Sequence, residues 1–201
     1  MNMKKEESIV ELLMLVPGIN VNRYNALWGL TPLMLAAWIS NANMVKLLLG
    51  VTGIQVNARD IVGYDLNPRE VQDQTVLHQA VIRYFEGHPK TRADYEIVEM
   101  LLQAEDVDVN AQDRKGNTAL HYAVFGKKKQ IVELLVNVVG IKVRLENNDD
   151  ITSWGWALVN SRSTCFPLVD AVHKAEKRSK ASSKAEKGSS SKSGWFRRRR
   201  G

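Results

Sequence analysis

A chain of 201 residues is the size of one or two ordinary domains and can bury a core without disulfides or metals. Hydrophobic residues make up 44% and charged residues 25%, which excludes a wholly disordered, collagen-like or membrane-spanning chain. The net charge of +6 belongs to one end, because residues 174–201 hold eleven lysines and arginines against two glutamates, whereas the other 173 residues hold 17 basic and 20 acidic side chains.

The N-terminal stretch predicts a helix rather than a targeting segment. Its apolar run from Ile9 to Val16 is only eight residues long and contains Glu11, so it is too short and too polar for a secretory signal or a transmembrane span. We therefore expect a soluble chain in which residues 1–22 form an N-terminal capping helix.

Apolar runs of a first kind recur at a fixed distance from a turn. Each begins nine residues before the turn; the runs start at Ile9, Met44, Ile97 and Ile131, and the turns are at Gly18, Gly53, Asp106 and Gly140. Glycine suits a turn that ends a helix because it tolerates left-handed backbone angles, and Asp106 is an imperfect substitute.

Segments of a second kind alternate with the first, and each begins with a threonine. They are Thr31-Pro32-Leu33-Met34, Thr75-Val76-Leu77-His78 and Thr118-Ala119-Leu120-His121. A threonine hydroxyl can cap the first turn of a helix, and proline fits the first helical position because its missing N–H would be unpaired there. The small residues one turn later permit close helix packing. The pattern predicts repeated pairs of helices.

These segments resemble the ankyrin repeat, whose helix-opening motif is Thr-Pro-Leu-His. The resemblance implies an all-α solenoid of paired antiparallel helices with hairpin loops, spanning residues 1–177. Its units would be the capping helix 1–22, repeat 1 at 23–57, repeat 2 with insertions at 58–110, repeat 3 at 111–144 and a degenerate C-terminal repeat at 145–177. Residues 178–201 are rich in serine and lysine and form no apolar pattern, so we expect a disordered basic tail.

Repeat 2 is longer than its neighbours in two places. From Asn57 to Thr75 is 18 residues, whereas from Asn110 to Thr118 is 8. Nine further residues lie between the two helices of this repeat, within residues 84–94. Insertions in repeat proteins map to loops, which leaves two interpretations open: a contribution to the binding face, or tolerated surface loops.

Catalytic and metal-binding signals are weak. His78 and His121 occupy the same repeat position, where the resemblance implies a framework histidine that hydrogen-bonds between repeats rather than a metal ligand. The single Cys165 excludes an internal disulfide framework, aligns with an apolar core position and indicates an intracellular setting. The stretch Gly126-Lys127-Lys128-Lys129 lacks the upstream glycine and following Ser or Thr of a phosphate loop, so it is interpreted as a basic turn. We expect no enzyme activity, no metal and no cofactor.

Protein binding is the better interpretation. In ankyrin proteins the residues just before the threonine and those seven and eight after it form the concave recognition surface. Carried onto this chain, the resemblance selects twelve contact residues: Leu27, Trp28, Leu30, Trp38, Ile39, Ile82, Arg83, Arg114, Lys115, Asn117, Phe125 and Gly126. An exposed patch with two tryptophans and a phenylalanine is typical of a protein-binding hot spot, although either tryptophan could instead pack against its own loop or an insertion.

The tail supports an alternative hypothesis. Two aromatic residues precede four positive charges, a combination that suits an anionic membrane or nucleic acid; the residues are Trp195, Phe196, Arg197, Arg198, Arg199 and Arg200. A solvated basic terminus or a nuclear-import signal is equally open. We expect a monomeric, non-enzymatic module that binds a protein partner of unknown identity. We expect it in the cytoplasm or nucleus, with secretion into a host cell by an intracellular bacterium left open.

Overall fold

The computed structural model describes residues 18–26, 29–61, 73–83, 92–159, 167, 169–170 and 173–174. Within these ranges the regular structure is helical. The helices are α2 (Pro32–Trp38), α3 (Ala42–Leu49), α4 (Val76–Arg83), α5 (Arg92–Leu102), α6 (Ala119–Phe125), α7 (Lys129–Val136) and α8 (Ser153–Val159).

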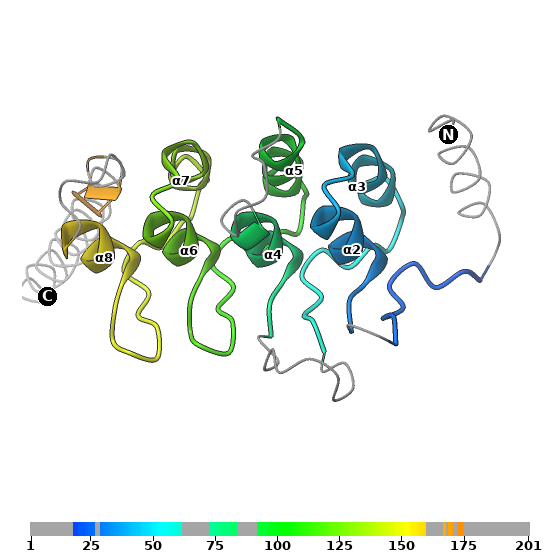
Figure 1. Ribbon diagram of the computed structural model, residues 1–201, viewed down its shortest axis with the longest axis horizontal. Coiled ribbons are helices and arrows are strands. Elements are labelled where there is room, and N and C mark those ends of the chain that lie inside the picture. The colour runs from blue at the N-terminus through cyan, green and yellow to red at the C-terminus, as the bar shows by residue number, and fades with distance from the viewer. Residues whose placement is uncertain are drawn as a thin grey trace, which may run out of the picture.

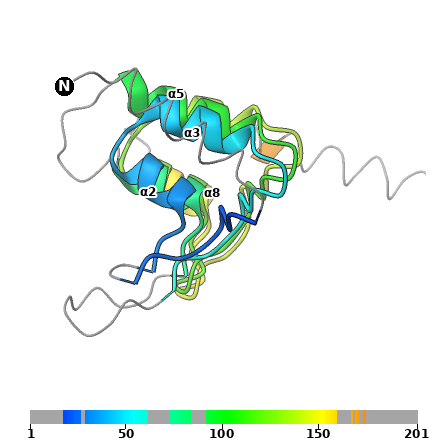
Figure 2. The same cartoon turned by 90° about the vertical axis from the view of Figure 1, so that its right-hand side faces the viewer.

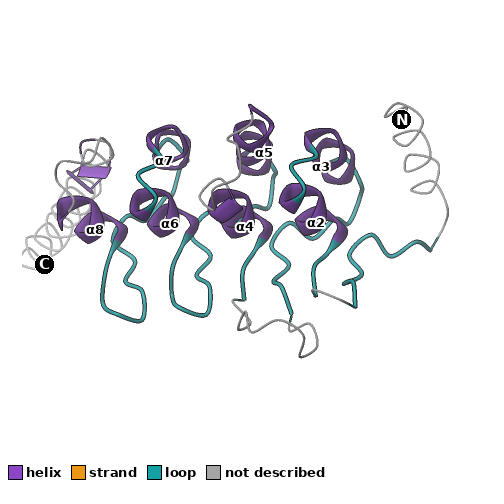
Figure 3. Cartoon of the chain, in the orientation of Figure 1, coloured by secondary structure: helices purple, strands orange, loops and turns teal. Residues whose placement is uncertain are grey.

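The helices form two parallel rows, with the hairpin loops projecting on one side (Figure 1, Figure 3). Helices α2, α4, α6 and α8 make the first-helix row, and each contacts the next member of the row. Helices α3, α5 and α7 make the second-helix row, and α2 pairs with α3, α4 with α5 and α6 with α7. Seen from the end, equivalent helices superpose (Figure 2). The predicted all-α stack of paired helices is confirmed.

Threonine caps start the first-row helices as the sequence predicts. The Thr31 hydroxyl accepts a hydrogen bond from the Met34 backbone N–H at 3.3 Å, with Pro32 opening the helix. At α6 the cap is reciprocal, because Thr118 accepts from the His121 N–H while the His121 ring accepts from the Thr118 N–H. Each cap satisfies donors that a helix end otherwise leaves unpaired.

The core lies between the two rows. Ala36, Ala37, Ala80 and Ala123 are at most 4% exposed, which places the helix backbones close together. Leucine and isoleucine side chains fill the remaining space between neighbouring pairs; the largest are Leu33, Leu77, Ile97, Leu101, Leu120, Ile131 and Leu135. Because each pair buries its apolar stripe against the next pair, the fold is stable only as a stack.

Histidines link consecutive repeats, as the resemblance implied. The His78 Nδ1 accepts from the Thr75 N–H at 3.2 Å, and its Nε2 donates to the Asn117 carbonyl of the next repeat at 3.0 Å. His121 repeats the arrangement, with Nε2 donating to the Ile151 carbonyl at 3.1 Å. Burial lowers the pKa of both imidazoles, so both are neutral at pH 7. In the first full repeat Met34 occupies this position and is 1% exposed.

Asparagines form a second ladder at the turns after the second-row helices. The Asn57 amide donates to the Asp106 carbonyl at 2.5 Å and accepts from the Asp108 N–H at 2.8 Å. Asn110 likewise donates to the Gly140 carbonyl at 2.9 Å and accepts from the Lys142 N–H at 2.8 Å. Asn22 makes the same pair of bonds to Gly53 and Gln55. One side chain therefore fixes the turn of the following repeat.

Glycine is required at three of these turns. Gly18, Gly53 and Gly140 have φ angles of 87°, 81° and 85°, in the left-handed region that the sequence predicts. Asp106 departs from the prediction, since it is not among the described residues with positive φ. A residue with a β-carbon disfavours that region, so this turn closes with an ordinary backbone.

The insertion between α4 and α5 is partly helical. Helix α5 has 11 residues, whereas α3 and α7 have 8 each. The first turn of α5 begins at Arg92, within residues 84–94, which were expected to hold an inserted loop. Part of that insertion is therefore helical. Residues 84–91 and the other insertion, within 62–72, lie outside the described residues.

Aromatic side chains pack together in the C-terminal repeat. The Trp154 indole stacks on the His173 ring with centroids 4.2 Å apart and planes at 12°, and Val169 of the same repeat is fully buried. Asp170 accepts from the Trp154 indole N–H at 3.4 Å and pairs with Lys174 at 2.7 Å. Cys165, which the sequence aligns with an apolar core position, lies outside the described residues.

Candidate protein-binding face

The C-terminal ends of the first-row helices place apolar side chains in a line. Trp38, Ile82 and Phe125 each lie seven residues after the capping threonine, and equivalent helices superpose in the stack (Figure 2). Ile39 and Phe125 are both 56% exposed, whereas Trp38 and Ile82 are half-buried. Together with Val159, which is 84% exposed at the same position of the last repeat, they form what we call the helix-end strip.

Phe125 belongs to an aromatic pair that sequence analysis missed. Its ring centroid lies 5.2 Å from that of Trp156 on α8, with the planes at 41°. Trp156 also meets the ring of His121 edge-on at 5.7 Å, which fixes the indole against the framework. Trp156 lies one helical turn before Val159, so the repeat register applied to the degenerate repeat could have found both.

Arg114 and Lys115 lie exposed at the tip of the hairpin before α6. Asp113 organises this tip, because its Oδ1 accepts from the Lys115 and Asn117 N–H groups, each at 2.9 Å. The Tyr122 hydroxyl donates to the other carboxylate oxygen at 2.5 Å. Burial and this bond raise the pKa of the Tyr122 phenol to about 12, so the donor persists at any physiological pH. The two basic side chains are therefore displayed on a rigid loop.

Two of the predicted contact residues belong to the framework instead. Asn117 is 6% exposed, its side-chain oxygen accepts from the Asn147 amide at 2.8 Å, and its carbonyl accepts from His78. It joins its own hairpin to the next one and to helix α4, and it is withdrawn from the surface. Leu30 is half-buried and packs against the core. A residue just before the capping threonine can therefore pack inside the stack instead of contacting a partner.

Several predicted residues lie outside the described part of the chain. These are Leu27, Trp28, the side chain of Arg83, and the tail residues Trp195, Phe196, Arg197, Arg198, Arg199 and Arg200. Their proposed roles rest on sequence alone.

The described residues offer little to catalysis or metal binding. Among them, no group of three or more histidine, cysteine, aspartate or glutamate side chains is placed to hold a metal ion. The nitrogens of His78 and His121 are committed to framework hydrogen bonds. No helix in the same ranges has the length and apolar character needed to cross a membrane.

The fold and the helix-end strip together define a helical-repeat protein. Its first-row helices begin at capping threonines and end in a row of apolar side chains. Comparison with known families then identifies the repeat. The family described as "Ankyrin repeats (3 copies)" matches residues 2–91, and "Ankyrin repeats (many copies)" matches residues 77–136. The two matches together cover more than half of the chain, which belongs to the ankyrin-repeat family. Ankyrin repeats are generally protein–protein interaction modules and typically lack enzymatic activity.

Curated relatives share parts of the chain. Alpha-latrotoxin-Lg1a of Latrodectus geometricus is 34% identical over 113 residues, 56% of this chain and 7% of the toxin. A Rickettsia bellii protein named for ankyrin repeats is 47% identical over 45 residues, 22% of this chain and 46% of that protein. A Plasmodium falciparum protein named for an E3 ubiquitin-protein ligase is 33% identical over 86 residues, 43% of this chain and 1% of that protein. The chain thus spans less than half the length of each.

Proposed function

We propose that this chain is a non-enzymatic module that binds a protein partner through the helix-end strip and the hairpin tips, the surface that forms the concave face in ankyrin proteins. The observation that carries the proposal is the exposure of large apolar residues at equivalent helix ends: Ile39 and Phe125 at 56% and Val159 at 84%. Apolar and aromatic residues in a line, supported by a rigid stack, are the usual composition of a binding hot spot.

Rigidity supports the same function. The hairpin before α6 is held by hydrogen bonds to Asp113, and consecutive repeats are joined by the histidine and asparagine ladders. A preorganised surface loses little conformational entropy on binding, so a modest number of contacts suffices for affinity.

The alternative function is that of an adaptor that contacts an anionic membrane or nucleic acid through residues 195–200. This alternative is supported by the composition of the sequence alone. Tail-driven binding would weaken steeply with salt, whereas apolar contacts would not.

Affinity capture from a cell lysate with four baits, read out by mass spectrometry, tests the proposal. The baits are wild type, the Ile39→Ser/Phe125→Ser double variant, the control Val139→Ser and a truncation after Arg178. Val139 is 98% exposed and lies beyond the end of α7, away from the helix-end strip. Removing two hot-spot side chains should weaken binding roughly 30-fold or more, while the control should change it little.

The outcomes separate the two candidates. A partner that is lost by the double variant and retained by the control and the truncation supports the helix-end strip. A partner that departs with the truncation alone, or one that the double variant retains in full, overturns it.

A further inference from the structure

We propose that the groove between helices α3 and α5 binds a segment of this same chain, residues 195–200 of the basic tail. The aromatic residues of the segment pack into the groove, and its arginines pair with carboxylates of α5 and of the turn that follows it. The inference is independent of the proposed function, because the groove lies between second-row helices, whereas the helix-end strip lies at the ends of first-row helices.

The groove has an apolar part and a charged part. It is a cavity of about 300 Å³ between the outer sides of α3 and α5. Ala42 and the half-buried Met100 give it apolar surface, while Lys46 and Glu99 give it charge. A thioether is a favourable contact for an aromatic ring, and a volume of this size is at the lower end of the range for ligand pockets. The groove therefore suits one large aromatic side chain flanked by charge.

The α5 side of the groove is acidic. Residues 93–110, which are α5 from its second residue and the turn after it, contain six carboxylates and no basic side chain. Of these, Glu99, Glu105 and Asp106 are exposed, and none of the three belongs to an ion pair in the described part of the chain. Asp94 and Glu96 already take part in other interactions. Three carboxylates thus follow one another from the groove to the turn.

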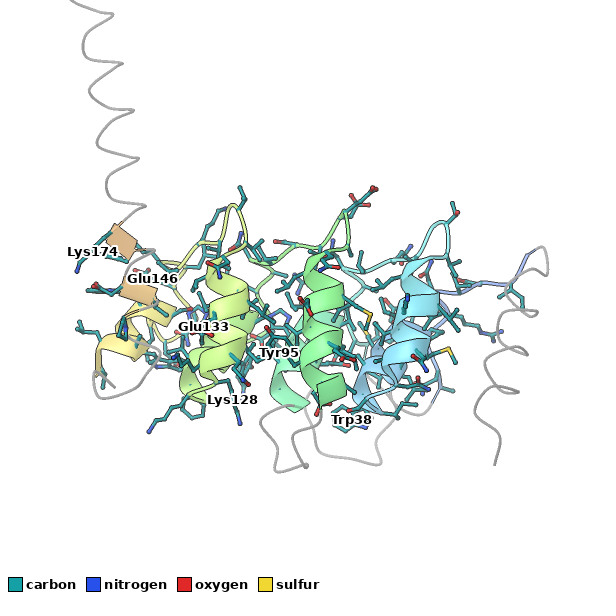
Figure 4. The ribbon with its side chains drawn as sticks, turned by 90° about the horizontal axis from the view of Figure 1, so that it is seen from above. Trp38, Tyr95, Lys128, Glu133, Glu146 and Lys174 are labelled. Atoms are coloured by element: carbon teal, nitrogen blue, oxygen red, sulfur yellow. The ribbon has the colours of Figure 1, made fainter. Side chains whose placement is uncertain are left out.

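Basic side chains of the neighbouring helices leave the groove side acidic. The α3 side contributes Lys46 alone, because residues 24–58 contain no other charged residue. The basic residues of repeat 3 lie at α7 and the turn after it; they are Lys127, Lys128, Lys129, Lys142 and Arg144. Helix α7 packs on the opposite side of α5 from α3, as the positions of Lys128 and Glu133 show (Figure 4). Lys128 already has a partner there, and Lys129 pairs with Glu133 at 3.7 Å.

The tail supplies the complementary groups. Residues 195–200 lie outside the described residues, and their sequence joins two aromatic side chains to four arginines, which bind carboxylates well. A second exposed acidic group, in the hairpin of the C-terminal repeat, is a poorer match because Arg114 and Lys115 lie beside it. Asn148 of that hairpin donates to the Arg114 and Lys115 carbonyls at 2.9 and 3.0 Å.

The tail is long enough to reach the groove of its own chain. Lys174, the last described residue, belongs to the C-terminal repeat, and Trp195 follows it by 21 positions, which span at most about 75 Å. Packed helices lie about 10 Å apart, so the groove, two and a half positions along the second-helix row, is roughly 25 Å away. Because a tether raises the effective concentration of the segment, weak contacts are enough to hold it. Docking there withholds the four arginines from other anionic ligands.

Photo-crosslinking in the full chain tests the inference. Phe196 is replaced by the photoreactive analogue p-benzoylphenylalanine, which keeps the phenyl ring and bonds to nearby C–H groups, those of methionine foremost. Trypsin releases α5 in one peptide, residues 93–114, because residues 93–113 contain no lysine or arginine. Mass spectrometry locates the attachment, and gel electrophoresis separates bonds within one chain from bonds between two.

Two pairs of substitutions, made in the photoreactive chain, test the charge. Glu99→Gln/Glu105→Gln removes two carboxylates beside the groove and leaves the tryptic peptide intact. Glu146→Gln/Asp149→Asn makes the same change in net charge at two exposed residues of the last hairpin. Circular dichroism checks that each variant folds.

We expect the main product to be a single chain in which the tail is bonded to peptide 93–114, with a yield independent of protein concentration. The yield should fall roughly threefold or more in the groove variant and change less than about 1.5-fold in the hairpin control. Trp195→Ala and added salt should lower it too, because they remove a ring contact and screen the ion pairs.

Other results overturn the inference. Bonds to the helix-end strip or the hairpin tips, or to no defined peptide, place the tail elsewhere. A crosslinked dimer whose yield rises with concentration assigns the groove to the tail of a second copy. If the two charge variants behave alike, the carboxylates beside the groove do not hold the segment. Each of these outcomes leaves the proposed function standing, since the capture with the Ile39→Ser/Phe125→Ser variant tests that separately.

Discussion

Replacing Asn110 by alanine tests the ladder that joins repeat 2 to repeat 3. The side chain makes two hydrogen bonds to the next turn, to the Gly140 carbonyl at 2.9 Å and from the Lys142 N–H at 2.8 Å. Each hydrogen bond contributes about 0.5–1.5 kcal/mol net. Because the site is only half-buried, water can reach the groups left behind, so we expect a loss of about 1–2 kcal/mol in the free energy of unfolding.

Urea denaturation followed by circular dichroism measures this loss, and amide hydrogen exchange localises it. Asn137→Ala is the matched control, since Asn137 is exposed at the end of α7 and its removal should change stability by less than about 0.5 kcal/mol. The Lys142 amide should lose protection in Asn110→Ala and keep it in the control. Equal stabilities for the two variants, or an unchanged Lys142 amide, would refute the role assigned to the asparagine.

Three further outcomes are expected. The free energy of unfolding should be constant above pH 6.5 and fall as the pH drops below it. Burial lowers the pKa of His78 and His121 from the usual 6.5, so the unfolded chain binds protons first as the pH falls. The loss should be at most about 1.4 kcal/mol per pH unit for each histidine. Urea titrations from pH 7.5 to 5 on wild type and the double glutamine variant check this, and equal slopes would contradict it. Gly53→Ala should lower the free energy of unfolding, measured by thermal denaturation, by about 1–2 kcal/mol, because φ at this residue is 81°. No atom lies within 4 Å of the added carbon, so the loss comes from the backbone conformation alone. The control Gly50→Ala, at a residue in the right-handed conformation, should not destabilise the chain. Lys128→Asn should stabilise α7 by about 0.5–1 kcal/mol by supplying the missing cap, and an unchanged melting temperature would count against the account of that turn.

Local signals explain which parts of the fold could be predicted. A threonine that caps a helix, as Thr31 does, and a glycine that ends one, as Gly53 does, act within a few residues of themselves, so their positions in the sequence carry the information. The repetition of these signals at a fixed spacing then predicts the stack. His78 was assigned its framework role through the same register, and the structure confirms it.

The candidate face was harder to predict, because exposure depends on what lies opposite in space. Asn117 stands just before a threonine, as a contact residue would, yet the neighbouring hairpin folds over it and Asn147 binds its side chain. Trp156 lies in a repeat where glycine replaces the framework histidine and the motif is hard to recognise. The lengthened α5 was missed because a counted surplus of residues locates an insertion without giving its conformation.

The position that Met34 occupies makes the links between repeats unequal. Between the second and third repeats a buried imidazole ties two units together in addition to Asn110. Between the third repeat and the C-terminal one the His121 imidazole does so, and the Asn147 side chain donates to that of Asn117. Between the first full repeat and the second, the buried thioether of Met34 takes the place of the imidazole, so that buried histidine link is missing, while the Asn57 bonds and the Ser40–Asp94 hydrogen bond remain. Under a stretching force applied to its two ends, the stack should therefore part first between its first and second full repeats. The rest, which includes the Phe125–Trp156 pair, would withstand higher load, so the protein could extend at one end and still hold a ligand at the other.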